Sequence, residues 1–121
     1  DTRIADWQSA PPAAIHADMG YFGALVTGAP CAGWRTLDLA AASVRLLVND
    51  ADVRQGSGAS VMGHPFEALA GFVAERGAAG QGVAAGEIVS TGTWTVPYLA
   101  QPGDRLVADF GPLGRVSVDL T

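Results

Sequence analysis

The chain has 121 residues, of which 49% are hydrophobic and 16% charged, and its formal net charge is −5. This composition excludes a disordered chain, which needs low hydrophobicity and high net charge, and the length fits one domain over residues 1–121. A negative chain without a basic cluster is a poor partner for nucleic-acid phosphates and lacks a basic membrane-surface helix. We therefore expect neither nucleic acid nor a membrane as partner.

All seven basic residues are arginines, so this chain carries neither a Schiff-base lysine nor a phosphate-loop lysine. The single Cys31 cannot form an internal disulfide, which favours a reduced, cytoplasmic setting and a passive thiol over a nucleophile. Apolar stretches end well short of the roughly 18 residues of a membrane span. The first residue is Asp1 rather than Met, which indicates a processed, truncated or excerpted piece.

The first half of the chain predicts one β-hairpin. Pro11 and Pro12 favour an extended approach segment over residues 1–14. Residues 18–27 are expected to form a glycine-containing turn and a short apolar strand. Residues 37–49 carry the clearest two-residue apolar spacing, and the turn chemistry after them predicts a hairpin with residues 53–55 as its second arm.

The second half predicts one main helix. His64-Pro65 opens it, because proline suits the first helical position, and Gly77 or Gly80 ends it. Its apolar stripe is expected to pack on a sheet. The stripe consists of Phe66, Leu69, Ala70, Phe72 and Val73.

Three further strands are expected over residues 87–90, 105–110 and 115–120, the last two joined by a tight turn at 111–114. Together these elements predict an α+β domain, with a mainly antiparallel sheet and one helix packed on it.

Few residues offer chemistry by pattern alone. His16 and Asp18 form either a ligand pair or general base with its orienting group, or a solvated surface pair. His64 is either a capping residue or a ligand contact. The turn at residues 90–93 presents hydroxyls and N–H groups around a glycine, which suit a carboxylate but also occur in ordinary turns. No Glu-x-Glu or His-x-His pair supplies metal-ligand spacing.

Three segments carry a more specific set of motifs. Residues 1–7 read Asp-Thr-Arg-Ile-Ala-Asp-Trp, and residues 56–65 read Gly-Ser-Gly-Ala-Ser-Val-Met-Gly-His-Pro. Residues 85–118 contain Ala-Gly-Glu-Ile-Val-Ser-Thr-Gly-Thr, then Gln-Pro-Gly-Asp, then Ala-Asp-Phe-Gly-Pro-Leu-Gly-Arg-Val-Ser-Val. In order and spacing they resemble the C-terminal half of the 2-keto-4-pentenoate hydratase / 4-oxalocrotonate decarboxylase family, within the fumarylacetoacetate hydrolase superfamily.

The resemblance implies a mixed, mainly antiparallel β-roll, of which this chain is the C-terminal part within a larger catalytic domain. It also implies Mg²⁺ or Mn²⁺ as cofactor and a small 2-oxo or 2-hydroxy acid as substrate, with the metal acting as a Lewis acid on an enolate. Hydratases of the family add water to 2-hydroxy-2,4-dienoates, and decarboxylases remove CO₂ from 4-oxalocrotonate-like diacids. A homo-oligomer or a complex with a related subunit is expected.

Two departures from the family pattern bear on activity. The family's metal ligands (a Glu-x-Glu pair and a third acidic residue) and its catalytic lysine lie upstream of the position that matches Asp1, so none is expected in this chain. The family's Asp-Asn-Ala-Ser-Ser/Cys-Gly loop reads here Asp-Met-Gly-Tyr-Phe-Gly over residues 18–23. A more apolar pocket, a different substrate or lost activity would each explain this change. Lost activity supports the alternative hypothesis, a non-catalytic homologue that serves as an assembly partner or binds small acids.

The resemblance assigns substrate contacts to two loops. In the first, Thr93 is the leading candidate, followed by Thr91 and Gly92, with a purely structural hydroxyl as the alternative for Thr93. In the second, Asp18 and Tyr21 are the candidates. We expect the 91–93 turn to face the 18–23 loop at the mouth of one cleft. No catalytic residue is assigned within the chain.

Overall fold

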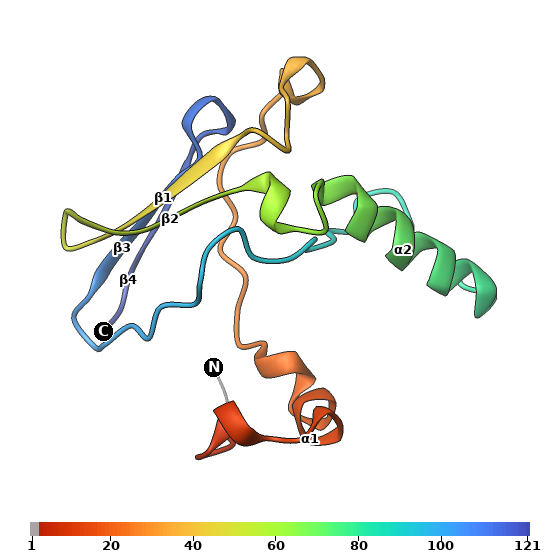
Figure 1. Cartoon of the computed structure of the whole chain (residues 1–121), viewed down its shortest axis with the longest axis horizontal. Helices are drawn as coiled ribbons and strands as arrows, with labels where there is room; N and C mark the ends of the chain where they lie inside the picture. Colours follow the sequence, from red (N-terminus) through yellow and green to blue (C-terminus); the bar gives the residue numbers. More distant parts are fainter. Residues whose placement is uncertain (1–2) are drawn as a thin grey trace.

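A four-stranded antiparallel sheet dominates residues 3–121, the part of the chain that the computed structural model describes (Figure 1). Its order is β2-β1-β3-β4, formed by β1 (Ser43–Val48), β2 (Ala51–Ser57), β3 (Arg105–Asp109) and β4 (Arg115–Asp119). The register places Arg45 opposite Asp109, and Asp109 opposite Arg115. Each of the strand pairs is antiparallel, as expected for the predicted α+β class.

Both predicted hairpins are confirmed. Asn49 and Asp50 join β1 to β2 with φ of 51° and 68°, the left-handed conformation that matches the twist of a two-residue hairpin. The Asn49 side chain also connects this turn to the next strand, because its Oδ1 accepts a hydrogen bond from the Arg105 backbone N–H at 3.0 Å. The turn between β3 and β4 is the single 3₁₀ turn η5 (Gly111–Leu113).

The two faces of the sheet differ in polarity because side chains alternate along each strand. Val44 and Val48 of β1 are buried, with 4% and 6% of their surface exposed, on the face that also carries Leu46 and Ala108. The opposite face carries charged residues of β1, β3 and β4. Apart from these two valines, Val61 is the only buried hydrophobic residue among residues 3–121. The core of this chain is therefore small.

The predicted helix is confirmed as α2 (Pro65–Ala78). Pro65 occupies its first turn, and His64 caps it, because His64 Nδ1 accepts a hydrogen bond from the Phe66 N–H at 3.0 Å. With 14 residues, α2 falls short of the roughly 20 apolar residues that cross a bilayer, and none of the other described helices qualifies.

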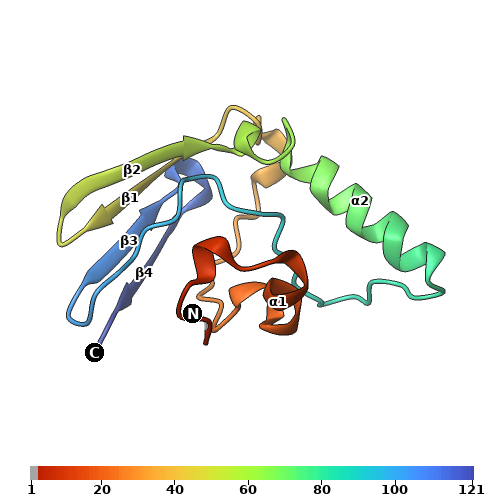
Figure 2. The same ribbon diagram turned by 60° about the horizontal axis from the view of Figure 1, so that its bottom comes forward.

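The expectation that α2 packs on the sheet is wrong. Figures 1 and 2 show α2 projecting beyond one end of the sheet, and Phe66, Phe72 and Val73 remain 41%, 38% and 45% exposed. Truncating Phe72 in this chain therefore does not create the buried cavity that costs about 3–5 kcal/mol. The helical period identifies an apolar stripe, but it does not specify what covers that stripe.

Other local expectations are also corrected. Residues 24–27, 37–42 and 87–90 form no strand. The proline pair does not exclude regular structure, since Pro12 starts the short helix α1 (Pro12–Ala17), where its missing N–H needs no partner. Figure 2 shows the segment after α2 (cyan) returning alongside the sheet as extended chain. Apolar content at these positions does not indicate strand pairing, since Leu25, Val26 and Ile88 are 51%, 48% and 70% exposed.

Candidate functional site

The turn that contains Thr93 borders a hollow on the apolar face of the sheet. One side of the hollow is lined by the sheet, with Val44 and Leu46 of β1, Ala108 of β3 and Phe110 just after β3. The other side is lined by the segment Gly92, Thr93, Trp94 and Thr95. The cavity has a volume of about 270 Å³. A mostly apolar hollow with a few polar groups is the usual form of a small-ligand site.

Thr93 supplies a neutral hydroxyl at this hollow. Its Oγ1 donates a hydrogen bond to the Thr95 carbonyl oxygen at 2.9 Å and accepts one from the Thr95 N–H at 3.3 Å. Gly92 has a φ of 124°, a conformation that side chains disfavour. Of the three predicted residues in this turn, Gly92 and Thr93 line the hollow, whereas Thr91 does not.

The other predicted pair, Asp18 and Tyr21, belongs to a cluster near the N-terminus. Asp18 is 6% exposed, and its carboxylate accepts hydrogen bonds from Nε and the backbone N–H of Arg3, at 2.6 and 3.1 Å. The Tyr21 hydroxyl donates to the Trp7 carbonyl oxygen at 2.8 Å, and the two rings meet edge to face with centroids 5.7 Å apart. Asp18 and Tyr21 therefore anchor their loop to residues 3–7.

These contacts hold an unusual backbone segment. Met19, Gly20 and Tyr21 have successive φ values of 54°, 63° and 67°, the left-handed region that non-glycine residues adopt at a cost. Figure 1 shows the α1 segment joined to the rest of the molecule by a long extended connection. That this loop faces the 91–93 turn across one cleft stays a prediction.

The other candidates from the sequence are His64, His16 and Cys31. His64 caps α2 and its ring lies 5.3 Å from the Phe66 ring, so its structural interpretation is supported by geometry. His16 is exposed in the last turn of α1. Cys31 is a free thiol whose Sγ lies 3.7 Å from the Pro112 carbonyl oxygen.

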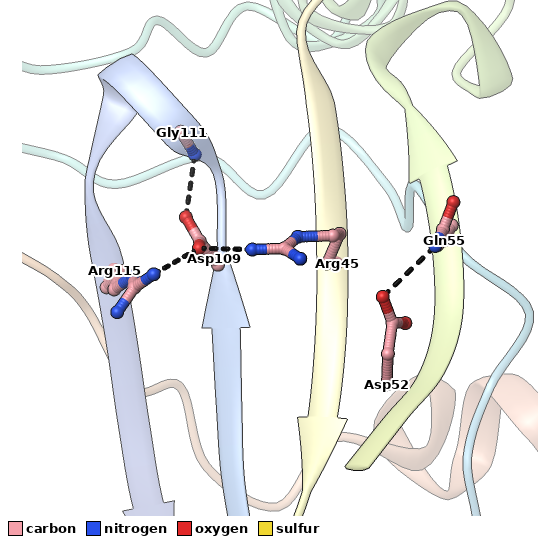
Figure 3. A network of polar contacts seen from close by, with 6 residues as sticks. All are labelled: Arg45, Asp52, Gln55, Asp109, Gly111 and Arg115. Atoms are coloured by element: carbon pink, nitrogen blue, oxygen red, sulfur yellow. Dashed lines mark hydrogen bonds and ion pairs between the residues drawn. The ribbon is translucent and has the colours of Figure 1, made fainter. Parts of the chain in front are cut away.

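Sequence reasoning missed the most strongly perturbed ionisable group, Asp109. This residue is 9% exposed, and one of its oxygens, Oδ2, lies 2.6 Å from Arg115 Nη2 and 3.2 Å from Arg45 Nη2 (Figure 3). The Gly111 N–H donates to its Oδ1 at 2.9 Å. The Arg115 hydrogen bond is the largest cause, followed by the Gly111 N–H, of the lowering of the Asp109 pKa to about 2.

A carboxylate in this environment is ionised at neutral pH. It contacts Arg45 of β1, Arg115 of β4 and the Gly111 N–H, so Asp109 stabilises the sheet rather than transferring protons. Side chains alternate between the two faces along β1, β3 and β4, which places these three charged residues on one face. Their contact could not be predicted from the sequence, because it depends on which strands pair.

A divalent metal site is not formed by residues 3–121, which contain no group of three or more His, Cys, Asp or Glu side chains placed to hold an ion. Mg²⁺ is held by oxygen ligands from carboxylates, and the only buried carboxylates described, Asp18 and Asp109, are bonded to arginines. The described residues therefore do not fit a metal centre of their own.

Calorimetric titration of this 121-residue chain with Mg²⁺ and with Mn²⁺ is accordingly expected to show no site of micromolar affinity. A saturating one-to-one isotherm with either ion would contradict this prediction and place metal ligands within the chain.

Comparison with known proteins is decisive for the family. The profile of the fumarylacetoacetate (FAA) hydrolase C-terminal family matches residues 2–121. The chain belongs to this family. A 2-hydroxyhexa-2,4-dienoate hydratase of Comamonas testosteroni is 33% identical over the whole chain, and a 4-oxalocrotonate decarboxylase of Pseudomonas putida is 35% identical over 76% of it. The chain spans 46% and 35% of the lengths of these two family members.

The fold of the family is confirmed by solved structures. One is the 4-oxalocrotonate decarboxylase of Pseudomonas putida G7, complexed with magnesium and adipate, which is 31% identical in sequence. The match covers 100% of this chain and 46% of the decarboxylase chain, with a TM-score of 0.86. The same enzyme complexed with calcium and acetate matches 91% of this chain and 42% of its own with a TM-score of 0.79 at 32% identity. This decarboxylase has therefore been solved with a divalent cation and with a small carboxylic acid.

Proposed function

We propose that this chain is the C-terminal part of a divalent-metal-dependent lyase that hydrates a 2-hydroxy-2,4-dienoate, in the degradation of aromatic compounds. The alignment with a 2-hydroxyhexa-2,4-dienoate hydratase over the full 121 residues carries this proposal. The related 2-oxo-diacid decarboxylase reaction is the second candidate, since the second relative and the structural neighbours are 4-oxalocrotonate decarboxylases.

The exposed surface supports a larger domain. The chain exposes 8410 Å², which exceeds by about 2,300 Å² the roughly 6,100 Å² expected of a folded monomer of this mass. One side of a standard protein interface buries only about 800 Å². The excess includes Phe66, Phe72 and Val73 of α2 and Ile88 at 70% exposure. We therefore place residues 1–121 within a larger catalytic domain whose remaining part covers this apolar surface.

In the intact protein, this chain supplies substrate contacts rather than the metal. Thr93 and Gly92 offer a neutral hydroxyl and backbone groups beside an apolar hollow, which suits an acid with a hydrocarbon chain, and Thr91 adjoins them in the same turn. The loop with Asp18 and Tyr21 forms the facing wall. We expect the ligands of Mg²⁺ or Mn²⁺ in the part of the domain outside this chain, as the resemblance to the hydratase and decarboxylase family implies.

The proposal extends to the cellular compartment and the oligomeric state of the protein. We place the protein in the cytoplasm, where a lone thiol such as Cys31 stays reduced. A homo-oligomer, or a complex with a related subunit, is consistent with the large apolar surface.

Assays of the full-length protein test the function. With Mg²⁺ present, loss of the dienoate absorbance of 2-hydroxyhexa-2,4-dienoate is expected, and chelation by EDTA is expected to abolish it. Release of CO₂ from 4-oxalocrotonate instead would establish the decarboxylase. No turnover of either compound, together with saturable binding of adipate, would contradict both enzymatic functions and establish a non-catalytic binder of small acids. Met19, Tyr21 and Phe22 in the altered loop are the residues that favour this alternative.

Replacing Thr93 with alanine in the full-length enzyme is expected to lower kcat/KM by about two- to twelvefold, which corresponds to the roughly 0.5–1.5 kcal/mol of one ligand hydrogen bond. Thr36→Ala is the matched control, because the Thr36 hydroxyl also donates to a nearby carbonyl oxygen, that of Gly33, in an exposed turn. If both variants keep kcat/KM within about twofold of the wild type, the Thr93 hydroxyl serves only its bond to Thr95.

A further inference from the structure

Gly56 in β2 lies unusually close to the backbone of the segment that carries Thr93. A Cβ at position 56 would lie 1.8 Å from the Trp94 carbonyl oxygen and 2.7 Å from its carbonyl carbon. Both are backbone atoms, so no side-chain rotation relieves the overlap. Only glycine is compatible with this approach, which explains the first glycine of the Gly-x-Gly segment without any ligand.

The segment needs such a contact because it has little else to hold it. Within residues 3–121, no backbone–backbone hydrogen bond involves residues 88–100. Thr93 bonds only to Thr95, within the segment. Around the turn the restraints are packing contacts: the Trp94 ring meets the Phe110 ring edge to face at 5.4 Å, and Gly92 lies against Val61. Further along, the segment is held by Arg54 over the Tyr98 ring at 5.9 Å and by the Gln101 side chain, which donates to the Leu99 carbonyl oxygen at 3.5 Å.

The opposing side of the contact is rigid by comparison. Gly56 pairs with Val44 of β1, which is 4% exposed at the centre of the sheet. If a methyl group were added at position 56, the unpaired 92–95 segment would move more easily than the sheet. Such a movement would displace the Thr93 hydroxyl from the hollow that it lines.

We propose that Gly56 and Trp94 are positioning residues: the close approach of Gly56 to the Trp94 carbonyl, together with the packing of Trp94 on Phe110, sets the Thr91-Gly92-Thr93 turn against the sheet. This proposal rests on the proposed role of Thr93 in substrate binding. Gly56 does not line the hollow, whereas Trp94, which it positions, does.

The principal test uses Gly56→Ala, Thr93→Ala and the double variant in the full-length enzyme. Gly56→Ala is expected to lower kcat/KM by about tenfold or more, since a displacement near 1 Å at a site costs up to about 100-fold. If Gly56 acts through the turn, its effect in the Thr93→Ala background is expected to be much smaller than in the wild type. Fully additive effects would overturn the proposal.

Gly58→Ala is the matched control. Its Cβ would lie 1.9 Å from a backbone carbonyl oxygen, that of Leu39, so the steric conflict is equally severe but involves residue 39 rather than the 92–95 segment. It is expected to lower the Tm while leaving kcat/KM of the folded protein within about twofold of the wild type, a change near the lower limit of one lost hydrogen bond. An equal loss of kcat/KM in both variants would contradict a specific role for Gly56.

A spectroscopic measurement separates this proposal from the proposed function. In full-length protein labelled with 5-fluorotryptophan, Gly56→Ala is expected to shift the ¹⁹F resonance of Trp94, and Gly58→Ala is expected to leave it unchanged. This measurement needs no activity, so an inactive wild type would contradict the function without affecting the test of positioning. An unmoved Trp94 resonance in a folded Gly56→Ala protein would overturn the proposal.

Trp94→Leu provides a second variant should Gly56→Ala fail to fold. It removes the ring contact with Phe110 and leaves the sheet intact. The variant is expected to lower kcat/KM in the wild type but to add little in the Thr93→Ala background. Unchanged kcat/KM in folded Trp94→Leu would overturn the role of Trp94 in positioning the turn.

Discussion

Replacing Asp109 with asparagine is expected to lower the stability of the sheet at neutral pH more than any other single charge removal among the described residues. The carboxylate connects β1, β3 and β4 through Arg45 and Arg115, and it also accepts the Gly111 N–H of the η5 turn. The amide of asparagine is neutral, so it loses the charge-assisted part of both arginine contacts. The measurement is the urea midpoint of unfolding at pH 7.

The pH dependence of this effect has a definite sign. The Arg115 hydrogen bond and the Gly111 N–H lower the Asp109 pKa from its ordinary value of 3.8 to about 2. A lowered pKa stabilises the folded state above the unfolded-state value, and this stabilisation is lost as the pH falls from about 4 to about 2. The Tm of the wild type is therefore expected to fall across this window more steeply than that of Asp109→Asn.

Asp119→Asn is the control for Asp109. Asp119 is paired with Arg105 at 3.9 Å, but both side chains are mostly exposed, at 79% and 60%, and exposed ion pairs contribute little. Its midpoint is expected to match the wild type. Equal acid profiles of the wild type and Asp109→Asn between pH 4 and pH 2 would contradict the role of this carboxylate.

The second large effect is expected from Asp18→Asn. Helix α1 has six residues, which is too short to be stable by itself, and the contacts of Arg3 with the buried Asp18 carboxylate anchor its C-terminal end. Hydrogen bonds to a charged group contribute roughly 1.5–3 kcal/mol each. We expect the variant to lose about 1.5 kcal/mol of local stability, the lower end of this range, because the Arg3 side chain is 78% exposed and its contact is screened by solvent.

Hydrogen exchange measures this loss by region. Amides of residues 3–22 are expected to lose protection in Asp18→Asn, while those of β1 and β3 keep it, because the cluster is built on contacts among residues 3–21. Asp6→Asn is the control, since Asp6 bonds to the exposed Ser9 only three residues away. A uniform loss of protection across the sheet would contradict a local anchor.

The sequence alone was sufficient wherever a local rule acts on neighbouring residues. His64-Pro65 predicted the start of α2, because a cap and a first-turn proline act within one turn of helix. Asn49 and Asp50 predicted the first hairpin, because both residues accept the left-handed conformation that its turn requires. The motifs at residues 1–7, 56–65 and 85–118 predicted the family, which the match over residues 2–121 confirmed.

The tertiary structure decided whatever depends on partners far away in the sequence. The stripe of α2 is apolar, yet Phe72 is 38% exposed, because helical periodicity acts within the helix and does not determine where the helix packs. Residues 87–90 resemble a strand but pair with nothing, since pairing depends on which edge is available. The strand register brings Asp109 to Arg45 and Arg115, and the close approach at Gly56 involves the Trp94 carbonyl, 38 residues later in the sequence. Local patterns constrain the backbone of a segment, whereas burial, charge pairing and close approach depend on the packing of distant segments.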